Sequence, residues 1–443
     1  MTATETAKTA ATPPPIKAAL TKPRAGLGSQ ILELLGSMKL AVVLLMLLAV
    51  LTWLGTLAQM DKGLFEVQRE YFESWFLIAD LPLSFWGEPL FTLKIPLPGA
   101  YPVMGLLFVN LMVGGMLRMR WQMRNAGILI VHVGIALLLI AGFVKLEFSY
   151  AGHLALYEAP EGVEQVGQRV HQSSTFVSFH DHELALLEDA GDSIIERLVP
   201  EAQLLAARDG TVTLRADGLP FTVQVHHWLD NCRPLPKGPM VRPTTPVLPA
   251  GDGGPDVFLR PEPPQKEREA NMVGCYVTVV TEDGRRLESM LEAAPFRLPF
   301  DGRRFPFTFE AGGKRYGLDL RRVVYDLPFS VRLDRFVKRD HPGTMTPADF
   351  RSFVTVEEGD QDRQVQIYMN TPLRKDGFVL YQTNWGPQQG GGPPFYSVFE
   401  VADNPSDIWP AIACFVIAIG LLLHFILKLY RFLNSSTREA LSS

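Results

Sequence analysis

Two histidines lie in segments that are otherwise entirely apolar. His132 is part of AGILIVHVGIALLLIAGFV, residues 126–144, and His424 lies near the end of a second apolar run, residues 408–427. An ionisable side chain in a membrane-spanning helix is costly and usually faces the interior of a helix bundle. Three interpretations stay open: hydrogen bonding between packed helices, ligation of a metal or haem by neutral imidazole, and proton relay. The relay is weakest, because relays normally recruit Asp or Glu and no apolar run contains either.

Two further apolar runs complete the set of elements that must hold these histidines. They cover residues 40–58 and 101–117, and none of the four runs contains a charged residue. Each is about as long as a helix that crosses a bilayer. Core helices of soluble proteins carry a polar face, which these runs lack. The sequence therefore predicts an integral membrane protein with four transmembrane helices.

The distribution of Lys and Arg beside the spans predicts their orientation. Residues 1–36, the link after the second span and the tail 428–443 are rich in basic residues, whereas the loop 59–100 has six acidic and three basic ones. We expect both termini in the cytoplasm and the loop outside. The first 36 residues are poor in large apolar side chains and are expected to form a disordered cytoplasmic tail. The link contributes Arg118, Arg120 and Arg124.

This orientation places the two histidines in the same half of the membrane. His132 follows Ala126 by six residues, about 9 Å of helix, and His424 precedes Leu427 by three, about 5 Å. Both are expected in the cytoplasmic leaflet. A small residue lies one turn away on the same helix face in each case, Ala136 after His132 and Gly420 before His424.

The segment 145–407 has a different pattern and is expected outside the membrane. Short alternating runs such as FTVQVHHW and SFVTVEEGDQDRQVQIYM are typical of strands, and EDG and EEGD suit hairpin turns. A Pro-rich passage at about 233–271 is expected to be an extended, partly disordered insertion. The predicted fold class is membrane α plus soluble β: four transmembrane helices with a large, mostly-β exported domain between the third and fourth.

Other motifs give weaker indications. HDHE, residues 180–183, places two imidazoles on one face of a strand, but lacks an identifiable third ligand, so a polar strand edge is favoured over a metal site. His226 and His227 should point to opposite faces of a strand and therefore not chelate together. Cys232 and Cys275 either pair or stay as buried thiols.

No catalytic motif is evident in the chain. It lacks CxxC and CxxCH, which argues against thiol–disulfide exchange and against self-attachment of c-type haem. No general acid, nucleophile or phosphate loop is recognisable, so the chain is not expected to be an enzyme by itself.

The chain resembles the ResB proteins, also called CcsB, of System II cytochrome c maturation. SMKLAVVLLMLLAVLTWLGTLAQ at residues 37–59 is similar to their first-span signature. The likeness continues in YFESWF, in the His-bearing third span, in MNTPLRKDGFVLYQTNWG at residues 369–386 and in a last span ending LLLHFILKLYR. The order of elements also matches. The loop 61–98 and the Pro-rich passage do not align with the family pattern.

The resemblance implies a subunit that carries haem b, as a non-covalent substrate, across the bacterial cytoplasmic (inner) membrane. Its implied partners are a tryptophan-rich membrane protein of the ResC/CcsA type, apocytochrome c and membrane lipid, with no nucleic acid. The complex would be a haem lyase or synthase, with the large domain on the periplasmic side. The seven Trp of this chain are scattered, which indicates the half that requires the partner.

The family's intramembrane histidine falls on His132, which the resemblance implies is a ligand of the haem iron. His424 is a candidate ligand from its depth alone. Arg118, Arg120 and Arg124 lie at the correct surface for haem propionates, although the topology signal alone explains them. Two alternatives remain: a structural subunit with a β-rich interaction domain and no haem ligation, and a b-type electron-transfer cytochrome with His132 and His424 as permanent ligands.

Overall fold

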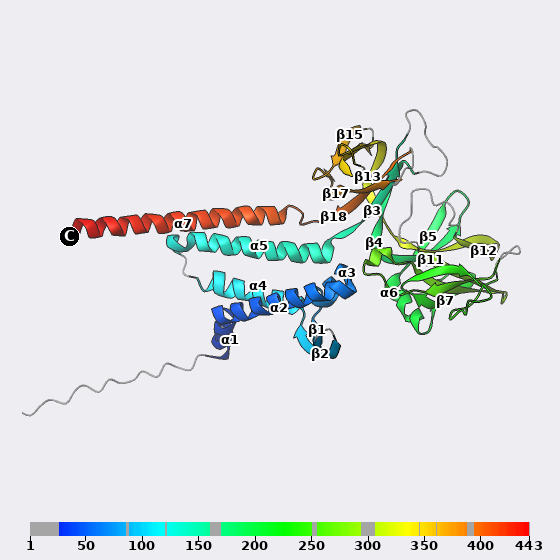
Figure 1. Ribbon diagram of the computed structural model, residues 1–443, viewed down its shortest axis with the longest axis horizontal. Helices are drawn as coiled ribbons and strands as arrows, with labels where there is room; N and C mark the ends of the chain where they lie inside the picture. Colours follow the sequence, from blue (N-terminus) through cyan, green and yellow to red (C-terminus); the bar gives the residue numbers. More distant parts are fainter. Residues whose placement is uncertain are drawn as a thin grey trace, which may run out of the picture.

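Four long apolar helices and a large β-rich domain make up the molecule (Figure 1). The computed structural model describes residues 26–85, 88–119, 122–159, 170–249, 255–293, 306–344, 346–359, 361–387 and 394–442. The long helices are α2 (Met38–Lys62), α4 (Ala100–Asn110) with its π-helical continuation η2 (Leu111–Leu117), α5 (Ala126–Phe148) after the short η3 (Met123–Asn125), and α7 (Trp409–Ser442). All four are long and apolar enough to cross a membrane. The four predicted apolar helices are thus confirmed, and they indicate a membrane protein.

The helices associate as two pairs, α2 with α4 and α5 with α7 (Figure 1). Glycines allow the backbones of α5 and α7 to approach closely. A Cβ atom on Gly127 would lie 2.6 Å from the backbone nitrogen of His424, and one on Gly420 would lie 2.8 Å from that of Val131. Small residues at such crossings are the usual basis of helix packing in lipid, where no hydrophobic force drives the helices together.

The β domain begins and ends with two strands that pair directly. β3 (Tyr150–Tyr157) follows α5, and β18 (Tyr396–Asp403) precedes α7. They are antiparallel, with Tyr150 opposite Asp403. Just beyond β18, the Ser406 hydroxyl donates a 2.9 Å hydrogen bond to the carbonyl of Ala141 in α5. The sheet therefore holds the ends of α5 and α7 side by side.

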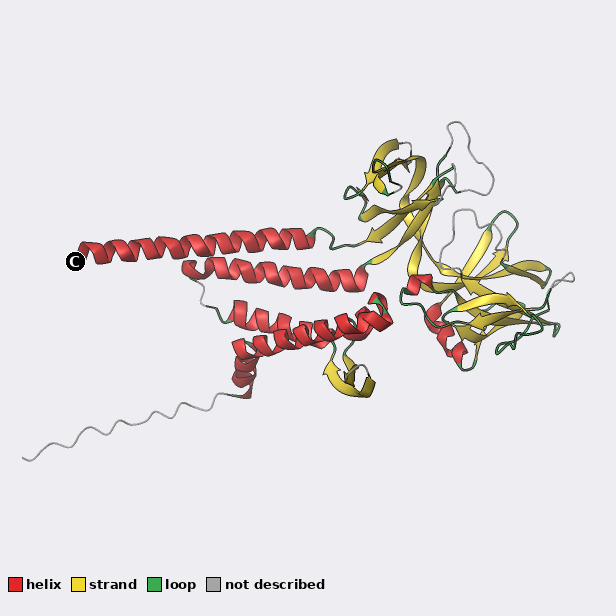
Figure 2. Ribbon diagram, in the orientation of Figure 1, coloured by secondary structure: helices red, strands yellow, loops and turns green. Residues whose placement is uncertain are grey.

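Two long strands run through the whole domain and join its two halves (Figure 2). β4 (Gln172–Asp189) and β13 (Lys314–Asp340) pair in three stretches, which are separated by irregularities between Arg322 and Val324 and between Asp326 and Val331. On one side they carry β3, β18 and four more strands, and on the other they carry β5 and β12. The further strands are β5 (Ile194–Pro200), β12 (Phe307–Ala311), β14 (Pro347–Glu358), β15 (Gln361–Tyr368), β16 (Leu373–Lys375) and β17 (Phe378–Gly386).

Each half has its own apolar core. One core gathers around Phe176, Leu333 and Phe399 of the large sheet. The other lies between Leu184 and Leu318 of the large sheet and Val277 of a separate four-stranded sheet. That sheet has the order β11-β10-β7-β6, from β6 (Thr211–Leu214), β7 (Phe221–Leu229), β10 (Val273–Thr281) and β11 (Arg286–Ala293). Every pairing is antiparallel among the described strands: some join consecutive strands as hairpins, whereas β4 with β13, β3 with β18 and β7 with β10 join strands distant in the sequence.

The Pro-rich passage is more ordered than its composition predicts. It contains the pair β8 (Cys232–Pro236) and β9 (Val257–Pro261) and the turn η6 (Arg268–Ala270), while residues 250–254 lie outside the described part. Leu259 is fully buried, and its N–H donates a 2.8 Å hydrogen bond to the Tyr276 hydroxyl. Burial of Leu259 and its hydrogen bond to Tyr276 therefore hold this Pro-rich passage against the β domain. Cys232 and Cys275 are both buried thiols.

Two terminal segments are helical where disordered or tail structure was expected. Residues 1–25 lie outside the described part, but Leu27–Leu35 forms helix α1. The Asn110 side chain in α4 donates hydrogen bonds of 2.6 and 3.0 Å to the carbonyls of Leu35 and Ser37, which stabilises the end of α1. The predicted tail after residue 427 continues α7 to Ser442.

The loop between the first two spans also has structure of its own. It contains α3 (Leu64–Val67), η1 (Gln68–Phe72) and a hairpin of β1 (Phe76–Phe85) and β2 (Glu88–Pro98). Leu77 and Ala79 of this hairpin are buried against the α2–α4 pair.

A methyl group at the crossing of α5 and α7 should destabilise the membrane domain. We expect Gly127→Ala to cost about 1–3 kcal/mol, because the added carbon would overlap the backbone of α7. Gly142→Ala, in the same helix, is the matched control, because a Cβ atom at Gly142 would have no neighbouring atom within 4 Å. Thermal unfolding in detergent compares the two variants. Equal melting temperatures would contradict the packing described.

Candidate functional site

His132 is held by the neighbouring second span. Its Nδ1 lies 2.9 Å from the carbonyl oxygen of Gly115 in η2. A carbonyl only accepts hydrogen bonds, so Nδ1 must carry a proton, and in the neutral imidazole Nε2 then presents its lone pair. Nε2 has no hydrogen-bond partner among the described residues. Histidines that bind metals almost always donate their other N–H in this way, which fixes both tautomer and ring orientation.

Gly115 is the residue that makes this contact possible. A Cβ atom at this position would lie 3.0 Å from Nδ1 of His132 and 3.2 Å from its Cγ. Any larger side chain would therefore push the imidazole away from the carbonyl. The pair of glycines in LMVGGML marks a site of close packing in the sequence. That His132 is the residue packed there is visible only in the structure.

His424 lies at a different interface. Its backbone packs against Gly127 at the start of α5, and its ring lies 5.6 Å from that of Phe425. Gly127 precedes His132 by five residues, about 7.5 Å along the helix. The imidazoles of His132 and His424 make no contact with each other. The structure therefore brings His132 together with Gly115 and does not bring it together with His424.

The three candidate arginines do not converge on His132. Arg118 directs Nη1 to the carbonyl of Leu32 at 3.4 Å and packs over Gly36, near the end of α1. Arg124 lies exposed in η3 and makes no hydrogen bond or ion pair with another described residue. Arg120 lies outside the described residues. Arg118 follows Gly115 by three residues, so it is the nearest of the described arginines to the His132 contact along η2.

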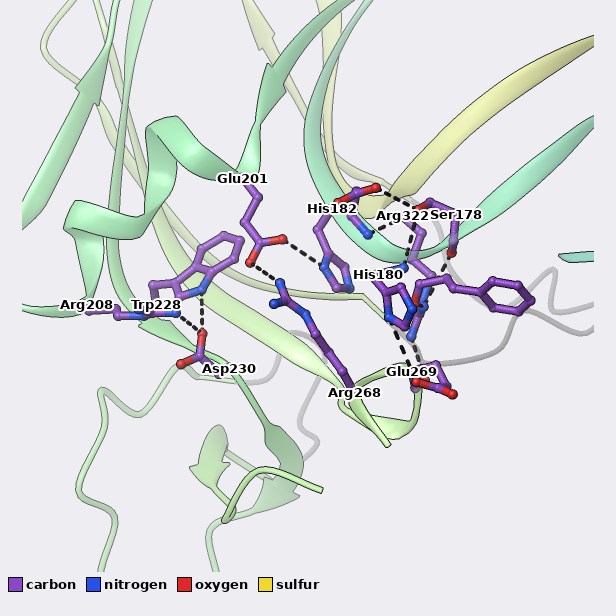
Figure 3. Close-up of polar contacts among 12 residues, drawn as sticks. Ser178, His180, His182, Glu201, Arg208, Trp228, Asp230, Arg268, Glu269 and Arg322 are labelled. Carbon is purple, nitrogen blue, oxygen red and sulfur yellow. Dashed lines mark hydrogen bonds and ion pairs between the residues drawn. The ribbon is translucent and has the colours of Figure 1, made fainter. Parts of the chain in front are cut away.

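A second polar cluster lies where β4 and β13 bend (Figure 3). Its centre is Arg322, which is only 3% exposed. Arg322 donates hydrogen bonds to the carbonyls of Phe179 and of Glu269, the latter at 2.6 Å. Burial lowers the pKa of Arg322 to about 10. The arginine thus joins β13, β4 and the end of the Pro-rich passage at one point.

The two histidines of HDHE belong to this cluster but have separate partners. Nδ1 of His182 lies 3.2 Å from a carboxylate oxygen of Glu201, at the start of the short helix α6 (Glu201–Leu204). The His180 ring instead stacks on Phe65 of α3, with centroids 3.9 Å apart. Among the described residues, no group of three or more His, Cys, Asp or Glu side chains is arranged to hold a metal ion.

Arg268 extends the cluster to the membrane helices. One guanidinium nitrogen lies 3.3 Å from Glu201 and another lies 3.4 Å from Glu66 of α3. The same guanidinium stacks over the Phe65 ring at 5.1 Å. Lys266 donates to the carbonyl of Met60 at the end of α2. The turn η6 therefore attaches the β domain to the α2–α3 corner.

Glu201 and His153, in and beside this cluster, also have shifted pKa values. Burial acts to raise the pKa of Glu201, but His182 and Arg268 outweigh it and hold the pKa below its ordinary value. Burial, assisted by the charge of Arg322, lowers the pKa of His153 in β3 to about 4. His153 is therefore neutral at physiological pH. Sequence reasoning missed Glu201, Arg268 and Arg322, because residues so distant in the chain give no local signal of their proximity.

Comparison with known families identifies one segment of the β domain. Residues 311–392 match the model of the ResB-like family, a range that includes β13 to β17. No curated protein matches the chain. The ResB resemblance predicted from the sequence is confirmed over this segment, and it indicates a role in cytochrome c biogenesis together with other components of that process.

The buried neutral His153 should make stability depend on pH. Between pH 6.5 and about 4 the unfolded chain binds a proton at this residue and the folded chain does not, so stability should fall as the pH falls through this window. The shift corresponds to a loss on the order of 3 kcal/mol at its limit. Thermal unfolding between pH 7 and pH 4 should show a shallower dependence for His153→Gln than for wild type. The exposed His341→Gln is the control, and equal slopes for wild type and His153→Gln would refute the assignment.

Proposed function

We propose that this chain is the haem-receiving subunit of a System II cytochrome c maturation complex. In this proposal haem b is a substrate that enters from the cytoplasmic half of the membrane, is bound at its iron by Nε2 of His132, and is passed outward for attachment to apocytochrome c. The main support is the hydrogen bond from Nδ1 of His132 to Gly115, because it leaves Nε2 with the lone pair that iron requires. The ResB-like segment supports the class of process.

The proposed orientation has both termini in the cytoplasm and the β domain outside. The basic residues of the link after the second span and of the C-terminal tail support it. His132 then lies about 9 Å inside the start of α5. This depth suits a haem whose propionates stay near the cytoplasmic surface. Arg118 is the described cation best placed for a propionate, since it lies one turn from Gly115.

We assign the second axial ligand to the partner protein and not to His424. His424 lies at the α5–α7 interface, whereas His132 faces η2 of the second span. Ligands on one iron must reach it from opposite faces of the porphyrin, and these two imidazoles are turned to different neighbours. The same arrangement disfavours a b-type cytochrome in which both histidines are permanent ligands. A tryptophan-rich ResC-type protein is the proposed source of the other ligand.

Loss of the His132 imidazole should remove haem from the chain. We expect His132→Ala, coexpressed with its partner, to lose most of the haem absorbance that copurifies with wild type and to fail in c-type cytochrome assembly. His424→Ala and the exposed His341→Ala should retain both properties. Full haem content and normal assembly in His132→Ala would refute the ligand assignment.

A second variant separates ligand orientation from ligand identity. Gly115→Ala keeps His132 but adds a methyl group 3.0 Å from its Nδ1. We expect a shifted Soret band and weaker haem retention, with unchanged protein yield. A spectrum identical to that of wild type would show that Gly115 does not orient the ligand.

Cysteine labelling tests the orientation. Asp192→Cys lies in the exposed turn between β4 and β5, and Asn434→Cys lies exposed near the end of α7. A membrane-impermeant maleimide should label Asp192→Cys in intact spheroplasts and Asn434→Cys only after permeabilisation. Wild type corrects for the native cysteines, two of which are buried. The reverse labelling pattern would invert the proposed topology.

A further inference from the structure

His226 and His227 lie together, contrary to the expectation that adjacent strand residues face opposite sides. The pairing of β7 with β10 has an irregularity near Tyr276, which lies opposite His226. His227 also adopts a positive φ of 51°. Left-handed backbone is uncommon for residues other than glycine and is concentrated at functional sites. The bulge turns both imidazoles to one side of the strand.

Each of the two rings contributes one nitrogen to a close pair. Nδ1 of His226 lies 2.9 Å from Nδ1 of His227, and the ring planes are 75° apart. Two nitrogen ligands about 2.0–2.1 Å from one metal ion, at a right angle to each other, are separated by about 2.9 Å. Right-angled nitrogen ligands are typical of the tetragonal sites of Cu2+. The spacing of these two nitrogens therefore matches adjacent positions around such an ion.

The surroundings fix one ring and leave the other accessible. Nε2 of His226 lies 3.3 Å from the Thr278 hydroxyl, and its ring is nearly parallel to that of Tyr276, with centroids 6.0 Å apart. Such outer contacts orient metal-binding histidines. His227 is exposed to solvent. Burial and the neighbouring His227 together lower the pKa of His226, and the Glu288 carboxylate on β11 opposes this shift only in part.

We propose that His226 and His227 form a bidentate site for Cu2+ on the β domain, with water completing the coordination. The pair supplies two protein ligands, one nitrogen from each imidazole. Without metal, the N–H at one Nδ1 donates a hydrogen bond to the lone pair of the other Nδ1. When Cu2+ binds, that proton moves through water to Nε2 of the same ring, so both Nδ1 lone pairs face the ion and the pair loses no proton. The site is independent of the haem proposal and lies on a different part of the chain.

Copper titration of the full-length protein in detergent tests the site. Wild type should bind one Cu2+ more than the variants do, with electron paramagnetic resonance showing hyperfine coupling to two nitrogens. His227→Asn removes the imidazole but tolerates the left-handed backbone, and His226→Gln removes the other ligand. We expect each to weaken binding at this site at least tenfold. His341→Asn, an exposed histidine elsewhere in the β domain, should bind Cu2+ like wild type.

The proposal fails if His226→Gln and His227→Asn bind Cu2+ with the stoichiometry, affinity and spectrum of wild type. His227→Gly provides a further check on folding, since glycine adopts positive φ freely. If it melts like wild type but loses the site, the loss comes from the imidazole. If it retains the two-nitrogen spectrum, the assignment of His227 is wrong.

Discussion

The antiparallel pairing of β3 with β18 is the constraint on which the rest of the molecule depends. One strand leaves α5 and the other leads into α7, so their hydrogen bonds hold the two helices together at the β domain. At the far end, Gly127 and Gly420 let the same two helices touch through their backbones. The pair is therefore fixed at both ends. The position of His132 relative to the β domain follows from this pair, because His132 is part of α5.

The orientation of His132 has a different origin. It depends on Gly115 of the second span, and thus on the contact between the two helix pairs. One hydrogen bond of this kind contributes about 1 kcal/mol to stability, but it selects a single tautomer and ring direction. Tyr101 adds a second connection between the pairs, since its hydroxyl donates a 2.7 Å hydrogen bond to Glu147 of α5. The fold thus separates two tasks: the pairing with α7 fixes the position of α5, and the second span fixes the direction of the imidazole.

Composition and periodicity were sufficient to predict the four apolar helices and the β-rich domain, because uninterrupted apolar runs and alternating strands are local signals. The failures involve contacts between distant residues. Helix α1 depends on Asn110, which lies far along the chain and caps it from α4. The Pro-rich passage is ordered because Leu259 is buried beside Tyr276. The strand alternation that separates His226 from His227 fails at a bulge, which no residue type in that segment announces.

Arg268 gives the β domain a second attachment to the membrane helices. The first is covalent, through α5 and α7, and the second joins η6 to Glu66 and Phe65 beside α2. The β domain is therefore attached to both helix pairs. A rigid-body tilt of the β domain must either break the contacts of Arg268 with Glu66 and Phe65 or change the angle between the two helix pairs. The hydrogen bond between His132 and Gly115 lies where the two helix pairs meet. A force applied to the surface of the β domain is therefore coupled to the geometry of that hydrogen bond.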